Sequence, residues 1–199
     1  GQELAGDGAP FDHPVDVEDR LVDRDDPGFT HPTKPIGRYL SHAQAQPMID
    51  HGQVWQDRGE KGWRRVVASP EPLEVLDVPA LLTLLEAGHV VVAAGGGGIP
   101  VVRDPAGRLR GVEAVIDKDL TAALLARTID ADVLVIATDV DHAAVDWGTP
   151  TQRDLGRVTV SQLRAHAADG QFASGSMGPK VDAAIRFVAG GGPRSVITS

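Results

Sequence analysis

Lys118 and Lys180 each stand where a helix is expected to begin. Residues 115–121 run from an apolar strand directly into a helix, and residues 175–180 form a glycine-containing approach to a helix with Pro179 at its first position. A cation at a helix N-terminus is unfavourable, because the helix dipole already places positive charge there. Each lysine alone is more simply a solvated surface residue, but two lysines at two helix starts favour a clamp for a phosphate group.

Four consecutive glycines follow the apolar segment 90–94, which is expected to be a buried strand. Backbone without Cβ atoms can approach a ligand closely and offer N–H groups to an anion at the carboxyl end of a strand. The run lacks the Gly-Lys-Ser/Thr of a P-loop, and Pro100 or Val101 stands where a dinucleotide fingerprint needs its third glycine. A tight turn and phosphate binding are equally compatible with this run, Gly95, Gly96, Gly97 and Gly98.

Lys34 is a third candidate, because it lies in the proline-flanked segment Pro32-Thr33-Lys34-Pro35-Ile36-Gly37. Prolines restrict the backbone on both sides, which suits a charge presented at a fixed place. A structural turn with an incidental lysine is equally compatible with this spacing.

Acidic residues accompany these lysines. Asp117 and Asp119 flank Lys118, and an aspartate at a helix start caps the helix and is favoured by its dipole. An acid at this place would also hold the lysine in position or lie near a phosphate-bound metal. The segment 138–141 follows the expected strand 133–137, where it forms a capped turn, or a nucleotide-contacting loop if the sheet binds ATP.

Other chemistries have weaker support. The seven histidines show no i, i+4 pairing and the chain has no cysteine, so no metal site is predicted. Ser176 lacks the Gly-x-Ser-x-Gly elbow of a nucleophilic serine.

The composition predicts one well-buried globular chain rather than a disordered one, with 42% hydrophobic and 24% charged residues among 199. The longest uncharged apolar stretch, 90–102, contains four glycines and is shorter than the roughly 20 residues that a membrane helix needs. No signal segment is recognised, so a cytoplasmic location is expected. The net charge of −9 is concentrated in residues 1–33, and aromatic residues make up 4%. No basic face is expected, so neither a nucleic-acid partner nor a membrane partner is predicted.

The order of the expected elements predicts an α/β fold. Strands alternate with helices after Pro70, and unbroken Val/Ile runs imply a mostly parallel sheet covered on both faces. Residues 1–33 show no apolar period long enough for a buried element, so they are expected to form an exposed arm or the ragged start of a fragment. The expected strands are 64–68, 73–76, 90–94, a hairpin of 101–103 with 109–115, 133–137 and 195–198, and the expected helices are 79–86, 119–129, 161–168 and 179–189.

Six segments in order resemble the carbamate kinase family over about residues 22–199. They are Asp25-Asp26-Pro27-Gly28-Phe29, the Pro32 to Gly37 motif, Arg64-Arg65-Val66-Val67-Ala68-Ser69-Pro70, 95–101, Gly111-Val112-Glu113-Ala114-Val115-Ile116-Asp117-Lys118-Asp119 and 175–181. The resemblance implies the amino-acid-kinase fold, a three-layer α/β/α sandwich with a mostly parallel sheet and a small protruding hairpin-rich subdomain. It also implies a homodimer of arginine metabolism that transfers phosphoryl reversibly between ATP and carbamate, with Mg²⁺, and often makes ATP from carbamoyl phosphate and ADP.

The resemblance also assigns roles to the positions that match the family's motifs. The resemblance implies that Lys118 and Lys180 contact the transferring phosphoryl group and the ADP phosphates, and that Asp119 organises them. It implies that Lys34 reaches carbamoyl phosphate from the subdomain. The chemistry agrees, because phosphoryl transfer needs positioning and charge neutralisation rather than a protein nucleophile. The implied nucleotide-contacting residues are Gly95, Gly96, Gly97, Gly98, Thr138, Asp139, Val140 and Met177.

The sequence also departs from the family pattern. The family's amino-terminal half, with its Gly-Gly-Asn-Ala and His-Gly-Asn-Gly loops, is not in these 199 residues, nor are the helix and strand that follow the last matched strand. A family strand matching 15–22 would carry charged residues here, and Gly148-Thr149-Pro150 stands where the family often has Gly-Lys-Pro. The expected parts are an acidic remnant or arm at 1–22, the protruding subdomain at 23–70 and a nucleotide-binding α/β lobe at 71–199.

Three functions remain open from the sequence. The leading hypothesis is a carbamate kinase whose activity truncation could impair, and the alternative is a non-catalytic nucleotide-binding fragment of such a kinase. A kinase of acetylglutamate or of a nucleoside monophosphate is less favoured, because the Pro32 to Gly37 motif belongs to the carbamate branch. An uncovered sheet would also favour self-association or poor solubility.

Overall fold

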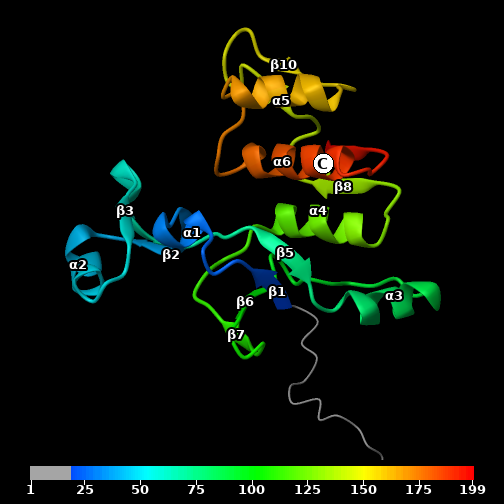
Figure 1. Cartoon of the computed structure of the whole chain (residues 1–199). Helices are drawn as coiled ribbons and strands as arrows, with labels where there is room; N and C mark the ends of the chain where they lie inside the picture. Colours follow the sequence, from blue (N-terminus) through cyan, green and yellow to red (C-terminus); the bar gives the residue numbers. More distant parts are fainter. Residues whose placement is uncertain (1–18) are drawn as a thin grey trace, which may run out of the picture.

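The computed structural model describes residues 19–199, which form an α/β structure with several separate sheets (Figure 1). The part of the expected acidic arm at 1–18 lies outside the described residues. Among the helices of the described part, none is long and apolar enough to cross a membrane.

The first described strand, β1 (Asp19–Val22), is a sheet strand rather than an exposed arm. It lies between β5 (Pro72–Val75), to which it is antiparallel, and β6 (Ile99–Arg103), to which it is parallel. Arg20 is fully buried and forms an ion pair with Asp77 at 3.9 Å. The expectation of an arm was therefore wrong for these residues, because a paired charge can be buried where an unpaired one cannot.

A hairpin extends the same sheet. β6 pairs antiparallel with β7 (Leu109–Gly111), which gives the order β5-β1-β6-β7. The expected hairpin is confirmed, although its second strand is shorter than 109–115. The expected strand at 73–76 and helix at 79–86 are confirmed as β5 and α3 (Val78–Glu86).

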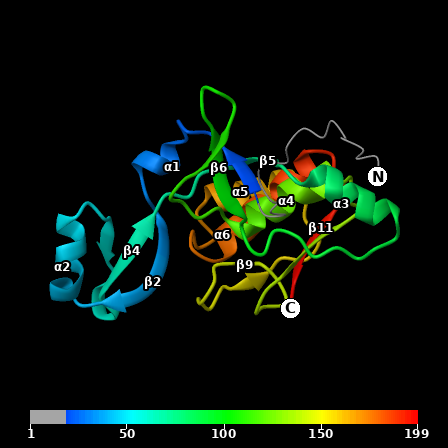
Figure 2. The ribbon, with the colours of Figure 1, turned by 90° about the horizontal axis from the view of Figure 1, so that it is seen from below.

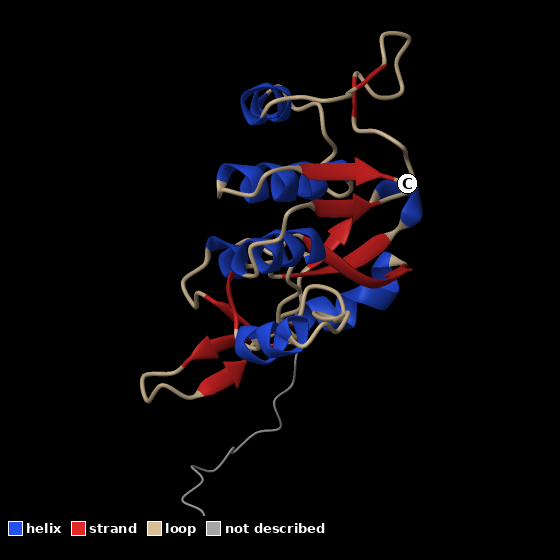
Figure 3. Ribbon diagram, turned by 90° about the vertical axis from the view of Figure 1, so that its right-hand side faces the viewer, coloured by secondary structure: helices blue, strands red, loops and turns tan. Residues whose placement is uncertain are grey.

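A second sheet consists of two parallel strands, β8 (Leu134–Ala137) and β11 (Ser195–Thr198), which run side by side in Figure 3. Helices α4 (Lys118–Thr128) and α6 (Met177–Ala189) cover one face, and small residues such as Ala123 and Ala183 let them approach closely. On the other face, Val135 and Val196 are neighbours in register and both are exposed. The expected cover on both faces is therefore not met in the described residues.

The segment 90–94 is not a strand, in contrast to the prediction. Its side chains at Val90 and Val92 are 98% and 94% exposed. A strand needs hydrogen-bonding partners, and no strand of the described residues pairs with this segment. The expectation of one mostly parallel sheet is likewise wrong for the described residues, where parallel and antiparallel pairings are mixed.

A separate small sheet projects from this body, as Figure 2 shows. It has the antiparallel order β2 (Lys34–Leu40), β4 (Trp63–Val67) and β3 (Trp55–Asp57). The neighbouring elements are α1 (Pro27–Thr30), α2 (His42–Asp50) and the short 3₁₀ helix η1 (Gly59–Lys61). The strand expected at 64–68 is confirmed as β4.

The remaining elements lie around α6. Helix α5 (Val160–Ala168) packs against α6, and a two-stranded pair is formed by β9 (Ala144–Val145) and β10 (Arg153–Asp154). Helix α6 begins two residues before Pro179, which therefore occupies the third rather than the first helical position. Proline is tolerated there because the first N–H groups of a helix need no acceptor within the helix.

Candidate active site

The candidate site is built on the first turn of α4. Asp117 caps this helix, since its side-chain oxygen accepts a hydrogen bond from the backbone N–H of Asp119 at 2.9 Å. Ile116, the residue before the cap, is buried among Val22 and Val102 and anchors the entry to the helix. The local sequence thus fixes both carboxylates at a buried helix start.

Asp119 brings the two helix-start lysines together. Lys180 Nζ lies 3.0 Å from Asp119 Oδ2 and 3.4 Å from Oδ1, and Lys118 Nζ lies 3.5 Å from the same Oδ2. The lysine side chains differ in exposure, 12% for Lys180 and 63% for Lys118. The expectation that these two lysines converge is therefore met in this geometry, although they are far apart in the sequence.

Lys34 reaches the same helix start from the projecting sheet. Its Nζ donates to Asp117 Oδ2 at 2.6 Å, across a sequence separation of 83 residues. The backbone route is short, because Lys34 pairs with Val67 and the next residue, Ala68, forms a bridge with Ala114. The projecting sheet thus carries its lysine to the helix that holds the other two.

The lysine cluster consists of Lys34, Lys118 and Lys180 with Asp117 and Asp119. Its net charge favours the binding of an anion. Three ammonium groups meet two carboxylates, which leaves a positive charge uncompensated within the cluster. Burial pushes the pKa of Asp117 upward, but the hydrogen bond and charge of Lys34 and the backbone N–H groups of the first turn outweigh it. They hold the pKa of this carboxyl below its ordinary value. The carboxylate of Asp117 therefore stays ionised beside Lys34.

The glycine run forms a turn against this helix start. A Cβ on Gly97 would lie 1.9 Å from the carbonyl oxygen of Ile116, so no other residue fits there. The buried Thr121 donates its hydroxyl hydrogen to the carbonyl of Gly97 at 2.7 Å. The backbone of Gly95, Gly96 and Gly98 has positive φ. The tight turn is thus confirmed, while contact with phosphates stays a prediction.

The other expected nucleotide residues lie at the carboxyl edge of the β8–β11 sheet. Thr138 directly follows β8; its N–H donates to the carbonyl of Thr198 at 2.8 Å, and its hydroxyl donates to Asp139 at 3.1 Å. Val140 follows in the same turn and is half-buried. Met177 begins α6 and packs against an apolar cluster that includes Val145 and Leu155. Helix α4 leads to the start of β8, and α6 leads to the start of β11. Each helix therefore runs antiparallel to its strand, so the helix N-termini lie at the carboxyl edge of the sheet.

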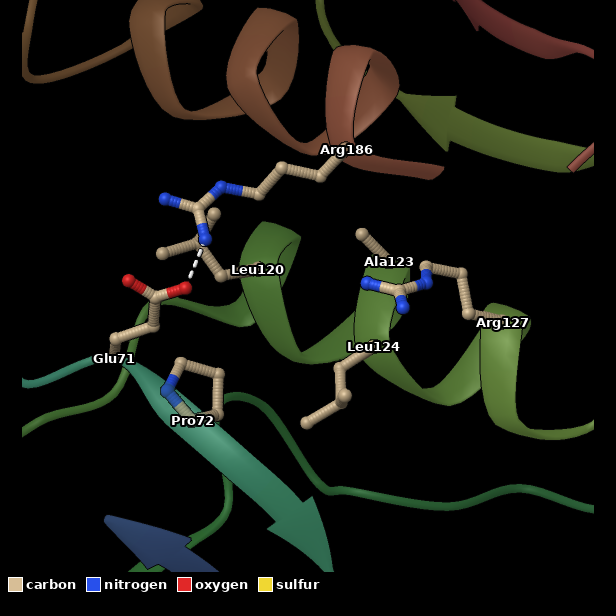
Figure 4. A pocket seen from close by; sticks show the side chains of 7 residues that line it. All are labelled: Glu71, Pro72, Leu120, Ala123, Leu124, Arg127 and Arg186. Atoms are coloured by element: carbon tan, nitrogen blue, oxygen red, sulfur yellow. Dashed lines mark hydrogen bonds and ion pairs between the residues drawn. The ribbon is translucent and has the colours of Figure 1, made fainter. Parts of the chain in front are cut away.

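Two hollows lie outside the lysine cluster. The smaller, shown in Figure 4, has a volume of about 60 Å³ and lies between α4, α6 and the start of β5. The ion pair of Arg186 with Glu71 crosses it, and it is too small for more than a few water molecules. The larger, of about 1050 Å³, is lined by residues of α5, α6 and β11 and extends to Asp141 and Thr198 at the sheet edge. Sequence reasoning did not predict either hollow.

Asp117 is a site residue that sequence reasoning named only as one of two acids beside Lys118, either of which could cap the helix or hold that lysine. The signal was present, because an aspartate directly before a helix has two oxygens and the cap uses one. The second oxygen accepts from Lys34, whose strand β2 lies far from Asp117 in the sequence, so this partner could not be read from the local pattern. The described residues hold no group of three or more residues suited to bind a metal ion.

Comparison with known proteins agrees with this architecture. A match to the amino acid kinase family spans residues 36–199, and the chain belongs to this family. The chain is 46% identical over 185 residues to a carbamate kinase of Thermococcus kodakarensis, which covers 92% of this chain and 58% of that protein. It is 48% identical over 181 residues to the carbamate kinase-like protein YahI of Escherichia coli, covering 89% of this chain and 57% of that protein.

A solved structure also shows similarity to a carbamate kinase. The carbamate kinase from Giardia lamblia bound to AMP-PNP superposes with a TM-score of 0.83 and 42% identity, over 92% of this chain and 58% of that one. The chain thus spans less than two thirds of the length of these relatives. The described residues carry an amino-acid-kinase fold that matches carbamate kinases over part of their length.

Proposed function

We propose that this chain is the nucleotide-side part of a carbamate kinase, which transfers phosphoryl reversibly between carbamoyl phosphate and ADP to give carbamate and ATP. One observation carries the proposal: Lys118 and Lys180 approach a single oxygen of the buried Asp119. Similarity at 46% identity to a carbamate kinase supports the substrate class. The Giardia relative bound to AMP-PNP supports ATP and ADP as the nucleotides.

In the proposed mechanism, the two lysines neutralise the phosphoryl group as it moves between carbamate and ADP. Phosphoryl transfer spreads negative charge over three oxygens and needs no protein nucleophile. Asp119 keeps both ammonium groups at one place before substrate binds, so little reorganisation is needed in the transition state. The more exposed Lys118 is the freer of the two to follow the group in flight.

Lys34 in this proposal binds the carbamoyl phosphate from the projecting sheet. The turn of Gly95 to Gly98 lies against the nucleotide phosphates, with its N–H groups as donors. The residues proposed to line the nucleotide are Thr138, Asp139, Val140 and Met177. The intact protein is proposed to form the three-layer α/β/α sandwich and to be a homodimer.

In this proposal, Mg²⁺ binds together with the nucleotide. The described residues do not form a metal centre of their own, and Asp117 and Asp119 are both engaged by lysines. These residues fit Mg²⁺ that is carried by ADP or ATP phosphates, where the ion keeps water ligands and needs few protein oxygens. When bound, Mg²⁺ neutralises phosphate charge that the lysines do not reach.

The test is ATP formation from ADP, Mg²⁺ and carbamoyl phosphate, measured with the 199-residue chain in a coupled assay. We expect Lys118→Ala and Lys180→Ala each to lower kcat by about 100- to 1000-fold, the usual cost of removing one group that stabilises transition-state charge. Lys61→Ala is the matched control, because Lys61 is an exposed lysine of η1 outside the site. Full rate in either site variant would refute the assignment.

A second candidate is a nucleotide-binding fragment without catalysis. The exposed Val90 and Val92 and the separate sheets favour it, together with the match to only 58% of the length of the Thermococcus relative. Calorimetry separates the two candidates. The fragment binds ADP, loses this binding in Lys180→Ala, and makes no ATP.

A further inference from the structure

Asp117 stands at the junction between the projecting sheet and the nucleotide-side body. One carboxylate oxygen accepts from the backbone N–H of Asp119 at 2.9 Å, and the other accepts from Lys34 Nζ at 2.6 Å. The Asp117 side chain is nearly buried, whereas that of Lys34 is one-third exposed. A single side chain thus touches the helix that organises two lysines and the strand that carries the third.

The backbone around this contact is closely connected. β4 pairs with β2 through Val67 and Lys34, and the N–H of Val115 donates to the carbonyl of Ala68 at 2.9 Å. A second ion pair, between Arg65 of β4 and Glu113, crosses the same junction farther out, with Glu113 largely exposed. The Lys34–Asp117 pair is the more buried of the two, so its geometry is better defined and less screened by solvent.

A cap alone does not account for the second oxygen. A serine or an asparagine caps a helix about as well as an aspartate does, so capping does not demand a carboxylate at this position. The carboxylate supplies what those residues lack, a full negative charge for the ammonium of Lys34. The pair ties Lys34 to the cap residue of α4, two residues before the Asp119 that Lys118 and Lys180 contact.

We infer that Asp117 is a positioning residue that couples the projecting sheet to the lysine cluster. It holds Lys34 beside the other two lysines, while its cap holds Asp119 in place. An incoming oxyanion therefore meets three ammonium groups that are already assembled, and Lys34 exchanges the carboxylate for the anion. This inference rests on the proposed function for the identity of the anion, but the coupling itself is a property of the unliganded chain.

The test uses the full chain without substrate and exploits its four lysines, Lys34, Lys61, Lys118 and Lys180. An amine-acylating reagent modifies each lysine at a rate that mass spectrometry measures. In Asp117→Ser the helix keeps a good cap and loses the carboxylate. We expect labelling of Lys34 relative to Lys61 to rise by about two- to fivefold, as for the loss of a partly exposed ion pair.

The matched control is Asp26→Ser, the same replacement at the cap of α1, where the side chain accepts from Gly28 N–H and no lysine is involved. It should leave the labelling of Lys34 as in the unmodified sequence. If Lys180 rises together with Lys34 in Asp117→Ser, the residue only stabilises α4 and the inference is overturned. Unchanged labelling of Lys34 would also overturn it.

A kinetic measurement distinguishes coupling from a merely structural role. In the ATP-forming assay, Asp117→Ser should raise KM for carbamoyl phosphate more than KM for ADP, because Lys34 is the lysine that loses its anchor. Equal changes in both KM values would contradict the inference. The proposed function fails separately, if ADP with carbamoyl phosphate gives no ATP and does not protect Lys118 or Lys180 from labelling in the unmodified chain.

Discussion

The two lysines that meet at Asp119 should contribute very differently to stability. Lys180 is nearly buried and makes two contacts with this carboxylate, at 3.0 and 3.4 Å, whereas Lys118 is largely exposed and makes one at 3.5 Å. Lys180→Met removes the closer of the two lysine partners of a buried charge, and the loss of a hydrogen bond to a charged group typically costs about 1.5–3 kcal/mol. Lys118→Met breaks a solvent-exposed pair, which costs about 0–1 kcal/mol.

Urea unfolding followed by tryptophan fluorescence measures these free energies. For a chain of this length, the loss in Lys180→Met corresponds to a fall of about 3–12 °C in Tm. The double variant Asp119→Asn with Lys180→Met tests the pair directly. Removing both partners leaves no buried unpaired charge, so we expect the double variant to lose less than the sum of the two single changes.

Equal destabilisation by Lys118→Met and Lys180→Met would refute this reasoning, as would strict additivity in the double variant. Loss of ATP formation in both lysine variants would not bear on this prediction, because the proposed catalysis depends on the charge of each lysine, whereas stability depends on burial. The exposed Lys61 again provides the control, and Lys61→Met should leave Tm unchanged within error.

Three further outcomes follow from other parts of the structure. Gly97→Ala should lower the free energy of unfolding by about 1–3 kcal/mol, because the new Cβ would lie 1.9 Å from a carbonyl oxygen. Gly111→Ala is the control and should cost less, because a Cβ at Gly111 would meet no atom within 4 Å. Denaturant titration of the two variants compares their free energies of unfolding. Because the pKa of Asp117 is lowered in the fold, its contribution to stability is present above the pKa of the unfolded chain and is lost as pH falls through the folded value. The stability difference between the unmodified chain and Asp117→Ser should thus shrink as pH falls below about 4 in pH-dependent melting, and a constant difference would contradict this. The double variant Val135→Thr with Val196→Thr should self-associate less, because both side chains are exposed on one face of the β8–β11 sheet. Light scattering measures this self-association, and Tm should change little. If the unsubstituted chain is already a monodisperse monomer, the prediction is wrong.

Local patterns in the sequence predicted most elements of the described part. Helix α4 begins and ends within a residue or two of the expected 119–129, because an acidic cap and a regular apolar spacing act within the helix itself. The strands β8 and β11 were predicted at 133–137 and 195–198 for a similar reason, since a short apolar run is specified locally, whereas their pairing with each other was not predicted. Predictions succeeded where the deciding interactions lie close in sequence.

Predictions failed where a distant partner decides the outcome. β1 was predicted to be part of a solvated arm, because no residue near Arg20 in the sequence indicates that it forms an ion pair with Asp77. The apolar segment 90–94 looked like a buried strand because its composition does not say whether a neighbouring strand is present. The convergence of Lys118 and Lys180 was anticipated from helix dipoles, but the contact of Lys34 with Asp117 depends on the pairing of β2 with β4.

Helix α4 serves the lysine cluster and the hydrophobic core at the same time. Asp119 lies in its first turn, and Ala123 and Ala126, one and two turns later, pack against α6 and β8. A larger side chain at either alanine would tilt the helix axis and displace the carboxylate that aligns the ammonium groups. If the proposed phosphoryl transfer depends on this carboxylate, a substitution at Ala123 or Ala126 should lower its rate although neither residue lies in the lysine cluster.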